Sequence, residues 1–214
     1  MRAAFFLLLA ACGFEVSGTP AGPDAQLIVD GSDTDAPVTP DVSGTRTLTK
    51  TAPDIGTTQA AGCSTGVSIN DTVWYRVLPL SDFGIAGAFT ITDVSFWVYR
   101  TQASPTVTVE IGTYNGMFPA DGFAFSPGNV AALQPVPVSL PGQLTPDGQR
   151  IDVRLAAPIV MPPSSSVVVK IASSTILLGS GGVSTRGAIS SAMCNWNPAM
   201  ETTSGFIVTV SGTP

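Results

Sequence analysis

The sequence predicts an all-β protein: a two-sheet antiparallel sandwich, jelly-roll-like, with about eight to ten strands and a disordered linker before it. Three observations support this class. Apolar residues recur at period two from about residue 67 onward. Turn-forming residues are dense, with 22 Gly and 18 Pro among 214 residues. No window of about ten residues both lacks a breaker and shows a helical apolar stripe.

The N-terminus predicts export. Met1-Arg2 precedes an apolar run over residues 3–11, which is far shorter than the roughly 20 residues of a membrane-spanning helix and is typical of a secretory signal. The sequence Leu9-Ala10-Ala11-Cys12-Gly13 then resembles the lipobox of bacterial lipoproteins. That resemblance implies a signal peptide over residues 1–11 and a lipid anchor on Cys12.

The same resemblance predicts where the protein is located. Glycine rather than aspartate follows Cys12, which in that family favours the outer membrane of the bacterial cell envelope. The alternative is that Cys12 is an ordinary cysteine in a signal cut elsewhere, and the protein is then periplasmic or secreted.

Residues 12–62 are predicted to be an acidic, disordered tether. The segment is rich in Gly, Pro, Thr and Asp, and from residue 13 to 62 seven acidic residues oppose two basic ones. Such a composition buries too little apolar surface to offset the entropy of ordering, and its charges extend the chain. The run Asp30-Gly-Ser-Asp33-Thr-Asp35 lacks the glycine and glutamate positions of a calcium loop, so we interpret it as solvated linker.

The domain over residues 63–214 contains the predicted strands. In the longest candidate, residues 89–100, the alternation changes phase near Asp93, so either a β-bulge or a turn is expected at Thr92-Asp93. The inward sets that we expect along the chain are Val73, Tyr75 and Val77; Val94, Phe96 and Val98; Val107, Val109 and Ile111; Ile151, Val153 and Leu155; Val167, Val169 and Ile171; and Phe206, Val208 and Val210.

The two remaining cysteines favour a disulfide. If Cys12 carries lipid, Cys63 and Cys194 are left as an even pair in an oxidising compartment. Two buried free thiols are the alternative.

A second resemblance covers residues 65–212. The motifs Trp74-Tyr75-Arg76-Val77, Asp82-Phe83-Gly84-Ile85 and 89–96 (FTITDVSF), together with 161–171 (MPPSSSVVVKI), resemble a β-sandwich module of secreted bacterial proteins. The resemblance implies the sandwich fold, and it brings no activity and no site residues with it.

Composition excludes several function classes. The net charge of −6 and the absence of a basic stripe argue against nucleic-acid binding. The chain has no histidine, so we expect neither a His-based catalytic triad nor a zinc site, and no cofactor. A structural calcium ion stays open, with turn-flanking candidates Asp71, Asp82, Asp93, Asp121 and Asp147.

Enzyme activity is not expected. A carboxylate-dependent glycoside hydrolase is the less favoured alternative, because the only acids on predicted strands, Glu110 and Asp152, both face outward and show no pairing.

Aromatic residues are the candidate ligand-binding groups. Trp97 and Tyr99 are predicted on the face opposite Phe96, where they either bind a ligand or are covered by long loops. Asn195, Trp196 and Asn197 follow Cys194, so a disulfide would hold that loop still. We therefore expect a lipid-anchored envelope protein whose sandwich is a non-catalytic binding or surface-structural module. Its partners would be the membrane, through the lipid, and a glycan or an envelope protein.

Overall fold

The computed structural model describes residues 44–50, 59–65, 68–102, 105–116, 125–141 and 148–214, and it confirms the all-β class. The strands are β1 (Arg46–Thr49), β2 (Gln59–Ala61), β3 (Ser64–Thr65), β4 (Ser68–Ile69), β5 (Thr72–Pro79), β6 (Phe89–Thr101), β7 (Thr108–Tyr114), β8 (Val130–Val136), β9 (Gln149–Met161), β10 (Ser166–Ser173), β11 (Ile176–Ser191), β12 (Trp196–Phe206) and β13 (Val208–Thr213). Two short 3₁₀ helices, η1 (Leu80–Phe83) and η2 (Pro127–Asn129), accompany them. No helix in these ranges is long and apolar enough to cross a membrane.

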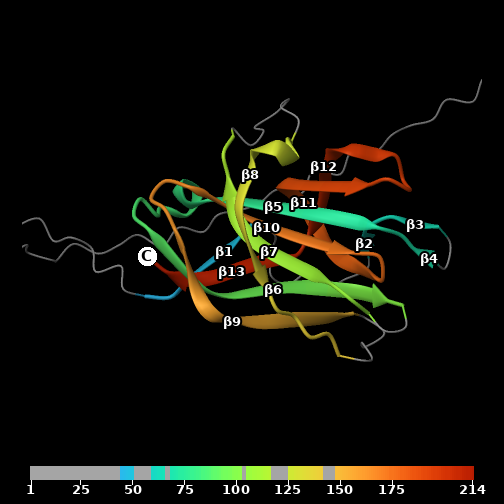
Figure 1. Cartoon of the computed structure of the whole chain (residues 1–214), viewed down its shortest axis with the longest axis horizontal. Helices are drawn as coiled ribbons and strands as arrows, with labels where there is room; N and C mark the ends of the chain where they lie inside the picture. The colour runs from blue at the N-terminus through green and yellow to red at the C-terminus, as the bar shows by residue number, and fades with distance from the viewer. Residues whose placement is uncertain (1–43, 51–58, 66–67, 103–104, 117–124, 142–147) are drawn as a thin grey trace, which may run out of the picture. The chain divides into compact units, whose positions relative to one another are not determined.

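In the described residues, one hydrogen-bonded sheet of eleven strands passes through β11 and forms the two antiparallel layers of the sandwich, while β3 and β4 form a separate pair (Figure 1). The first sheet has the order β1-β13-β6-β9, and the second has the order β11-β5-β10-β7-β8. Strand β11 belongs to both, because Ile176–Leu178 pair with β6 whereas Gly187–Ser190 pair with β5. β12 extends the second sheet beyond β11, and β2 pairs with β11 at Leu178–Ser180.

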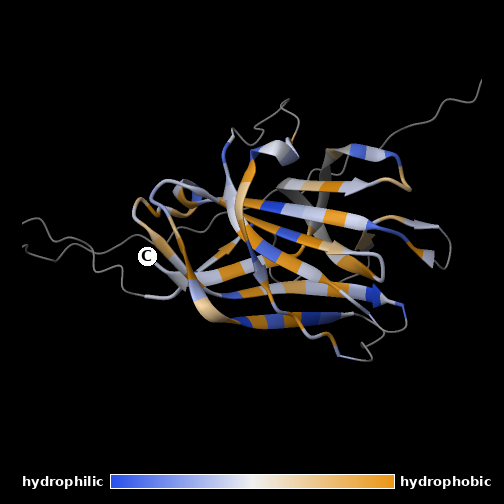
Figure 2. Ribbon diagram, viewed as in Figure 1, coloured by the Kyte–Doolittle hydropathy of each residue, from blue (hydrophilic) through white to orange (hydrophobic). Residues whose placement is uncertain are grey.

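Alternation along the strands builds the main core between the sheets, and it appears as apolar and polar bands in Figure 2. Inward residues of both sheets share one cluster, for example Phe96 and Val210 of the first sheet and Trp74, Ile111 and Ile171 of the second. The shared cluster is what identifies the two layers as the halves of one sandwich.

The second sheet also buries part of its outer face. A second cluster there includes Tyr75, Val77, Val168 and Phe125. The predicted inward set of β5 is therefore corrected: Trp74, Arg76 and Leu78 point to the main core, and Tyr75 and Val77 point to the opposite face. Because β5 is covered on both faces, the period-two pattern could not tell which of its faces lies inside.

The sheet begins earlier than the sequence predicts. Strands β1 and β2 lie within the range assigned to the tether, and β1 pairs with the C-terminal β13. Leu48 is fully buried in the main core. The boundary at Cys63 is thus corrected, because β1 offers only one core residue among threonines and leaves almost no hydrophobic signal. Residues 1–43 and 51–58, which include the lipobox with Cys12 and most of the predicted tether, lie outside the described residues, as do Asp121 and Asp147.

The structure decides one alternative that the sequence leaves open and confirms one further prediction. Strand β6 continues through Thr92, with register shifts between Ile91 and Asp93, so the phase change is a bulge and not a turn. Cys63 and Cys194 form a disulfide, with their Cα atoms 5.9 Å apart.

Candidate functional site

The disulfide fixes the turn between β11 and β12. Ser191 pairs with Trp196 across this hairpin, and the Asn195 N–H donates to the Ala192 carbonyl at 3.2 Å. Asn195 has a φ of 58°, the left-handed conformation that asparagine tolerates better than most residues. We call residues 192–197 the hairpin tip. Its centre, Cys194, is bonded to the buried Cys63, so the tip is a rigid part of the surface.

The side chains of the hairpin tip differ in exposure. Asn195 and Asn197 are exposed, as is Met193, whose exposed fraction is 68%. Trp196 is half-buried and packs against the main core. The tip therefore presents two amides and a thioether, and its tryptophan contributes mainly to packing.

Trp97 and Tyr99 lie on the outer face of the first sheet, opposite Val94, Phe96 and Val98, as predicted. Both are half-buried. The Trp97 ring lies against Gly148 and Gly179, where an added Cβ would come within 2.6 Å and 2.4 Å of the ring. Its Nε1 is buried without a hydrogen-bond partner among the described residues.

These two groups of predicted residues are not brought together. Trp97 contacts Gly179 near the beginning of β11, whereas the hairpin tip follows the end of that strand. The sequence therefore predicted two separate surfaces and not one site.

A polar hollow of about 310 Å³ also lies on the outer face of the first sheet, lined by Asp93, Val94, Ser95, Arg150, Asp152 and Ser211. Its acids are engaged with neighbours: Arg150 Nε lies 2.7 Å from Asp152 Oδ1, and the Thr92 hydroxyl donates to Asp93 at 2.7 Å. The Arg150–Asp152 pair is largely exposed, so it adds little stability.

The two acids considered for hydrolysis lie on different sheets. Asp152 is exposed on β9, as predicted. Glu110, in contrast, is half-buried on β7, with its Oε2 2.7 Å from the ammonium of Lys170 on β10. Its outward orientation is therefore right, but an ion pair replaces the expected full solvation.

Tyr75 lies beside this ion pair, since Lys170 pairs in register with both Tyr75 and Glu110. Burial raises the pKa of the Tyr75 hydroxyl above its ordinary value; the Lys170 charge opposes that rise and the Glu110 charge adds to it. The phenol therefore stays protonated well above neutral pH.

Arg76 is the largest buried charged side chain among the described residues. Its guanidinium lies 4.3 Å from the centroid of the Phe206 ring and donates to the Phe206 carbonyl. Burial lowers the pKa of Arg76 to about 9. Because it points between the sheets, we assign it to the core and not to a surface site.

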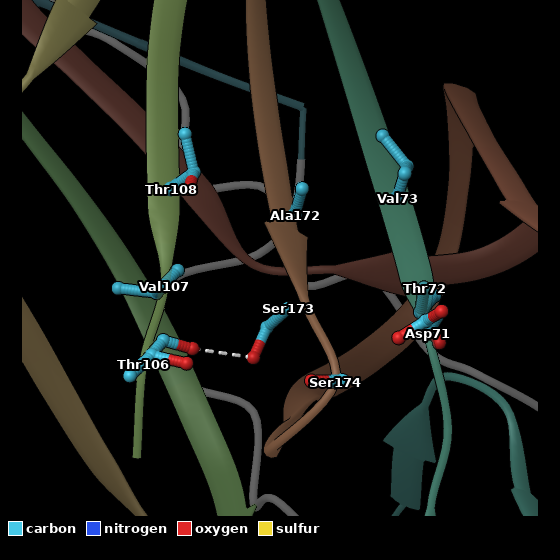
Figure 3. Close-up of a pocket in the computed structure, with 9 residues that line it drawn as sticks. All are labelled: Asp71, Thr72, Val73, Thr106, Val107, Thr108, Ala172, Ser173 and Ser174. Carbon is cyan, nitrogen blue, oxygen red and sulfur yellow. Dashed lines mark hydrogen bonds between the residues drawn. The ribbon is translucent and has the colours of Figure 1, made fainter.

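A hollow of about 450 Å³ lies where three neighbouring strands of the second sheet end. We call it the strand-end hollow. It is lined by residues at the beginning of β5, before and at the beginning of β7, and at the end of β10: Asp71, Thr72, Val73, Thr106, Val107, Thr108, Ala172, Ser173 and Ser174 (Figure 3).

Hydrogen bonds fix one rim of this hollow. The Ser173 hydroxyl donates to the Thr106 carbonyl, as Figure 3 shows, at 2.5 Å. The Thr175 hydroxyl donates to the same carbonyl at 3.0 Å and accepts from the Thr106 N–H at 2.8 Å. The segment that enters β7 is thereby fastened to the end of β10.

Sequence reasoning missed this hollow. The sequence indicates Asp71 only as a calcium candidate, and the residues around it are small or hydroxyl-bearing. The available signal was that three strand ends, at residues 71–73, 106–108 and 172–174, carry Thr, Ser or Asp. No group of three or more His, Cys, Asp or Glu side chains that could hold a metal occurs among the described residues.

Comparison of the chain with protein-family models, with curated proteins and with solved structures finds no match.

Proposed function

We propose that this chain is a lipid-anchored protein of the bacterial cell envelope, and that its β-sandwich is a non-catalytic binding or surface-structural module. The observation that carries the proposal is the hairpin tip. A disulfide holds its centre, and Met193, Asn195 and Asn197 face solvent. A surface that is already rigid loses little conformational entropy when it binds a partner.

The proposed location has separate support. A disulfide that joins the beginning of the domain to a late hairpin is typical of oxidising compartments. The lipobox-like segment at Leu9-Ala10-Ala11-Cys12 supports anchoring, because two or three acyl chains hold a protein stably to a bilayer.

Metabolic labelling with a palmitate analogue tests the anchor. We expect the full chain, expressed in a Gram-negative bacterium, to incorporate the label and fractionate with membranes. The Cys12→Ala variant should lose both the label and the membrane association. Label in that variant, or an unmodified Cys12 in the mature wild-type chain, would contradict the proposed anchor.

Site-specific photo-crosslinking tests the hairpin tip. A photoreactive amino acid is placed at Met193, with Val160 as the matched control. Both are exposed apolar residues, at 68% and 63%, but Val160 lies on β9, away from the tip in the chain. We expect envelope adducts from position 193 and few from position 160. Equal yields at both positions would count against a dedicated surface at the tip.

Glycan binding is the second candidate function. The sequence places it at Trp97 and Tyr99, but their rings are half-buried. The observation that favours it is instead the strand-end hollow, whose lining is rich in hydroxyl groups.

A further inference from the structure

The strand-end hollow has the dimensions and the fixed walls of a binding site. Its volume of about 450 Å³ lies within the range of roughly 300–1,000 Å³ found for small-ligand pockets. Its floor is one row of side chains across three strands, since Ala172 pairs in register with both Val73 and Thr108. The hydrogen bonds from Ser173 and Thr175 to Thr106 fix the rim.

Three polar side chains in this hollow are free of hydrogen bonds and ion pairs with the described part of the chain. The Asp71 carboxylate and the hydroxyls of Thr108 and Ser174 make no side-chain hydrogen bond to any described residue, and all three residues are exposed. Thr72 differs, because its hydroxyl is buried, donates to the Asn70 carbonyl and accepts from the Cys63 N–H. The hollow thus combines a fixed framework with free acceptors and donors on its surface.

The chemistry of the lining selects a ligand class. A carboxylate and hydroxyls can accept and donate many hydrogen bonds, while Val73, Val107 and Ala172 supply small aliphatic patches between them. Lys170, two residues from Ala172 on the same face of the second sheet, is already paired with Glu110. An acidic ligand would therefore meet the Asp71 carboxylate without compensation from Lys170, and an apolar ligand would leave the hydroxyls unpaired.

We propose that the strand-end hollow binds a neutral oligosaccharide, with Asp71 accepting hydrogen bonds from sugar hydroxyls. Thr108 and Ser174 exchange further hydrogen bonds with the ligand, and sugar C–H groups lie on Val73 and Ala172. This inference rests on the proposed non-catalytic binding role and names the ligand class. It moves the glycan contact from the aromatic residues of β6 to the ends of β5, β7 and β10.

Methyl-resolved NMR of the full chain tests the proposal. The probes are neutral tetrasaccharides of glucose, mannose, galactose and N-acetylglucosamine, with a galacturonic acid tetrasaccharide as the charge control. We expect at least one neutral probe to shift the methyl signals of Val73, Thr108 and Ala172. The acidic probe should bind about tenfold more weakly, because Asp71 repels it.

Two substitutions locate the contact. Asp71→Asn should weaken binding of the selected sugar about tenfold, and the near-isosteric Thr108→Val about fivefold, as expected for the loss of a charged and a neutral hydrogen bond. Asp152→Asn is the matched control, because it removes an exposed carboxylate from the other sheet and should leave affinity unchanged.

Three results would overturn the inference: no methyl shift with any neutral probe, methyl shifts that leave Val73, Thr108 and Ala172 unchanged, or equal effects of Asp71→Asn and Asp152→Asn. Each can be distinguished from failure of the proposed function. Lipid labelling of Cys12 and crosslinking at Met193 do not depend on the hollow, so they would persist if only the hollow proposal is wrong.

Discussion

Removing the disulfide should destabilise the domain by several kcal/mol, mainly through the unfolded state. Cys63 and Cys194 are 131 residues apart, and closing a loop of this length costs the unfolded chain about 5 kcal/mol of conformational free energy in the loop-entropy model. The side-chain amide of Asn70 donates a long hydrogen bond to the Cys63 Sγ atom, at 3.8 Å, but the other native hydrogen bonds of Cys63 do not need its sulfur. Its N–H donates to the Thr72 hydroxyl at 3.0 Å, and its carbonyl accepts from the Asn70 N–H at 3.0 Å. These bonds persist in a Cys63→Ala, Cys194→Ala double variant.

Urea unfolding of the full chain, followed by tryptophan fluorescence, measures this loss, because Trp74 is fully buried and reports on the core. We expect the unfolding free energy to fall by about 3–5 kcal/mol, which moves the midpoint by roughly 1.5–2.5 M urea. Wild-type protein under reducing conditions should match the double variant, and the reductant should not affect the variant further. A difference below about 1 kcal/mol would refute loop closure as the stabilising mechanism.

Three further predictions concern the core. Leu48→Ala should lower the unfolding free energy by about 2–4 kcal/mol in the same urea assay, because Leu48 is fully buried. If residue 48 belonged to a disordered tether, the substitution would change the unfolding free energy by less than about 0.5 kcal/mol. Trp74→Phe removes the 3.0 Å hydrogen bond from the indole N–H to the Ala61 carbonyl. We expect the unfolding free energy to fall by about 1–3 kcal/mol and the amide hydrogens of β2 to exchange faster. Unchanged amide exchange in β2 would contradict this role of the hydrogen bond. For Arg76, burial lowers the pKa to about 9, so above that pH the native state binds fewer protons than the unfolded state. We therefore compare the unfolding free energy of the wild type with that of Arg76→Met at each pH. The difference, wild type minus variant, should rise above pH 9 by up to about 1.4 kcal/mol per pH unit. A difference that stays constant between pH 8 and 11 would count against the lowered pKa.

The parts of the fold that were predicted correctly are those in which one strand face is buried and the other is not. In β6 the alternation and the position of its phase change follow from the spacing of the apolar residues, although that spacing left a bulge and a turn as alternatives. Two features broke that condition. Strand β5 is buried on both faces, so its apolar pattern does not indicate which face lies between the two sheets. Strand β1 buries only Leu48, so its sequence shows no alternation from which a strand could be predicted. Tertiary pairing with β13 decides the state of β1, and local sequence does not report such pairing.

The candidate site was harder to predict for a related reason. Whether Trp97 faces solvent depends on what lies against its ring, and two glycines distant in the sequence, Gly148 and Gly179, approach it closely. The strand-end hollow likewise exists only because the ends of β5, β7 and β10 lie at one level of the second sheet. Sequence inspection favours large, distinctive side chains, but large aromatic side chains are also those that folding buries most readily. In this chain, small polar residues such as Thr108 and Ser174 keep their hydrogen-bonding groups free, so the more promising ligand contacts are at residues that have no distinctive motif.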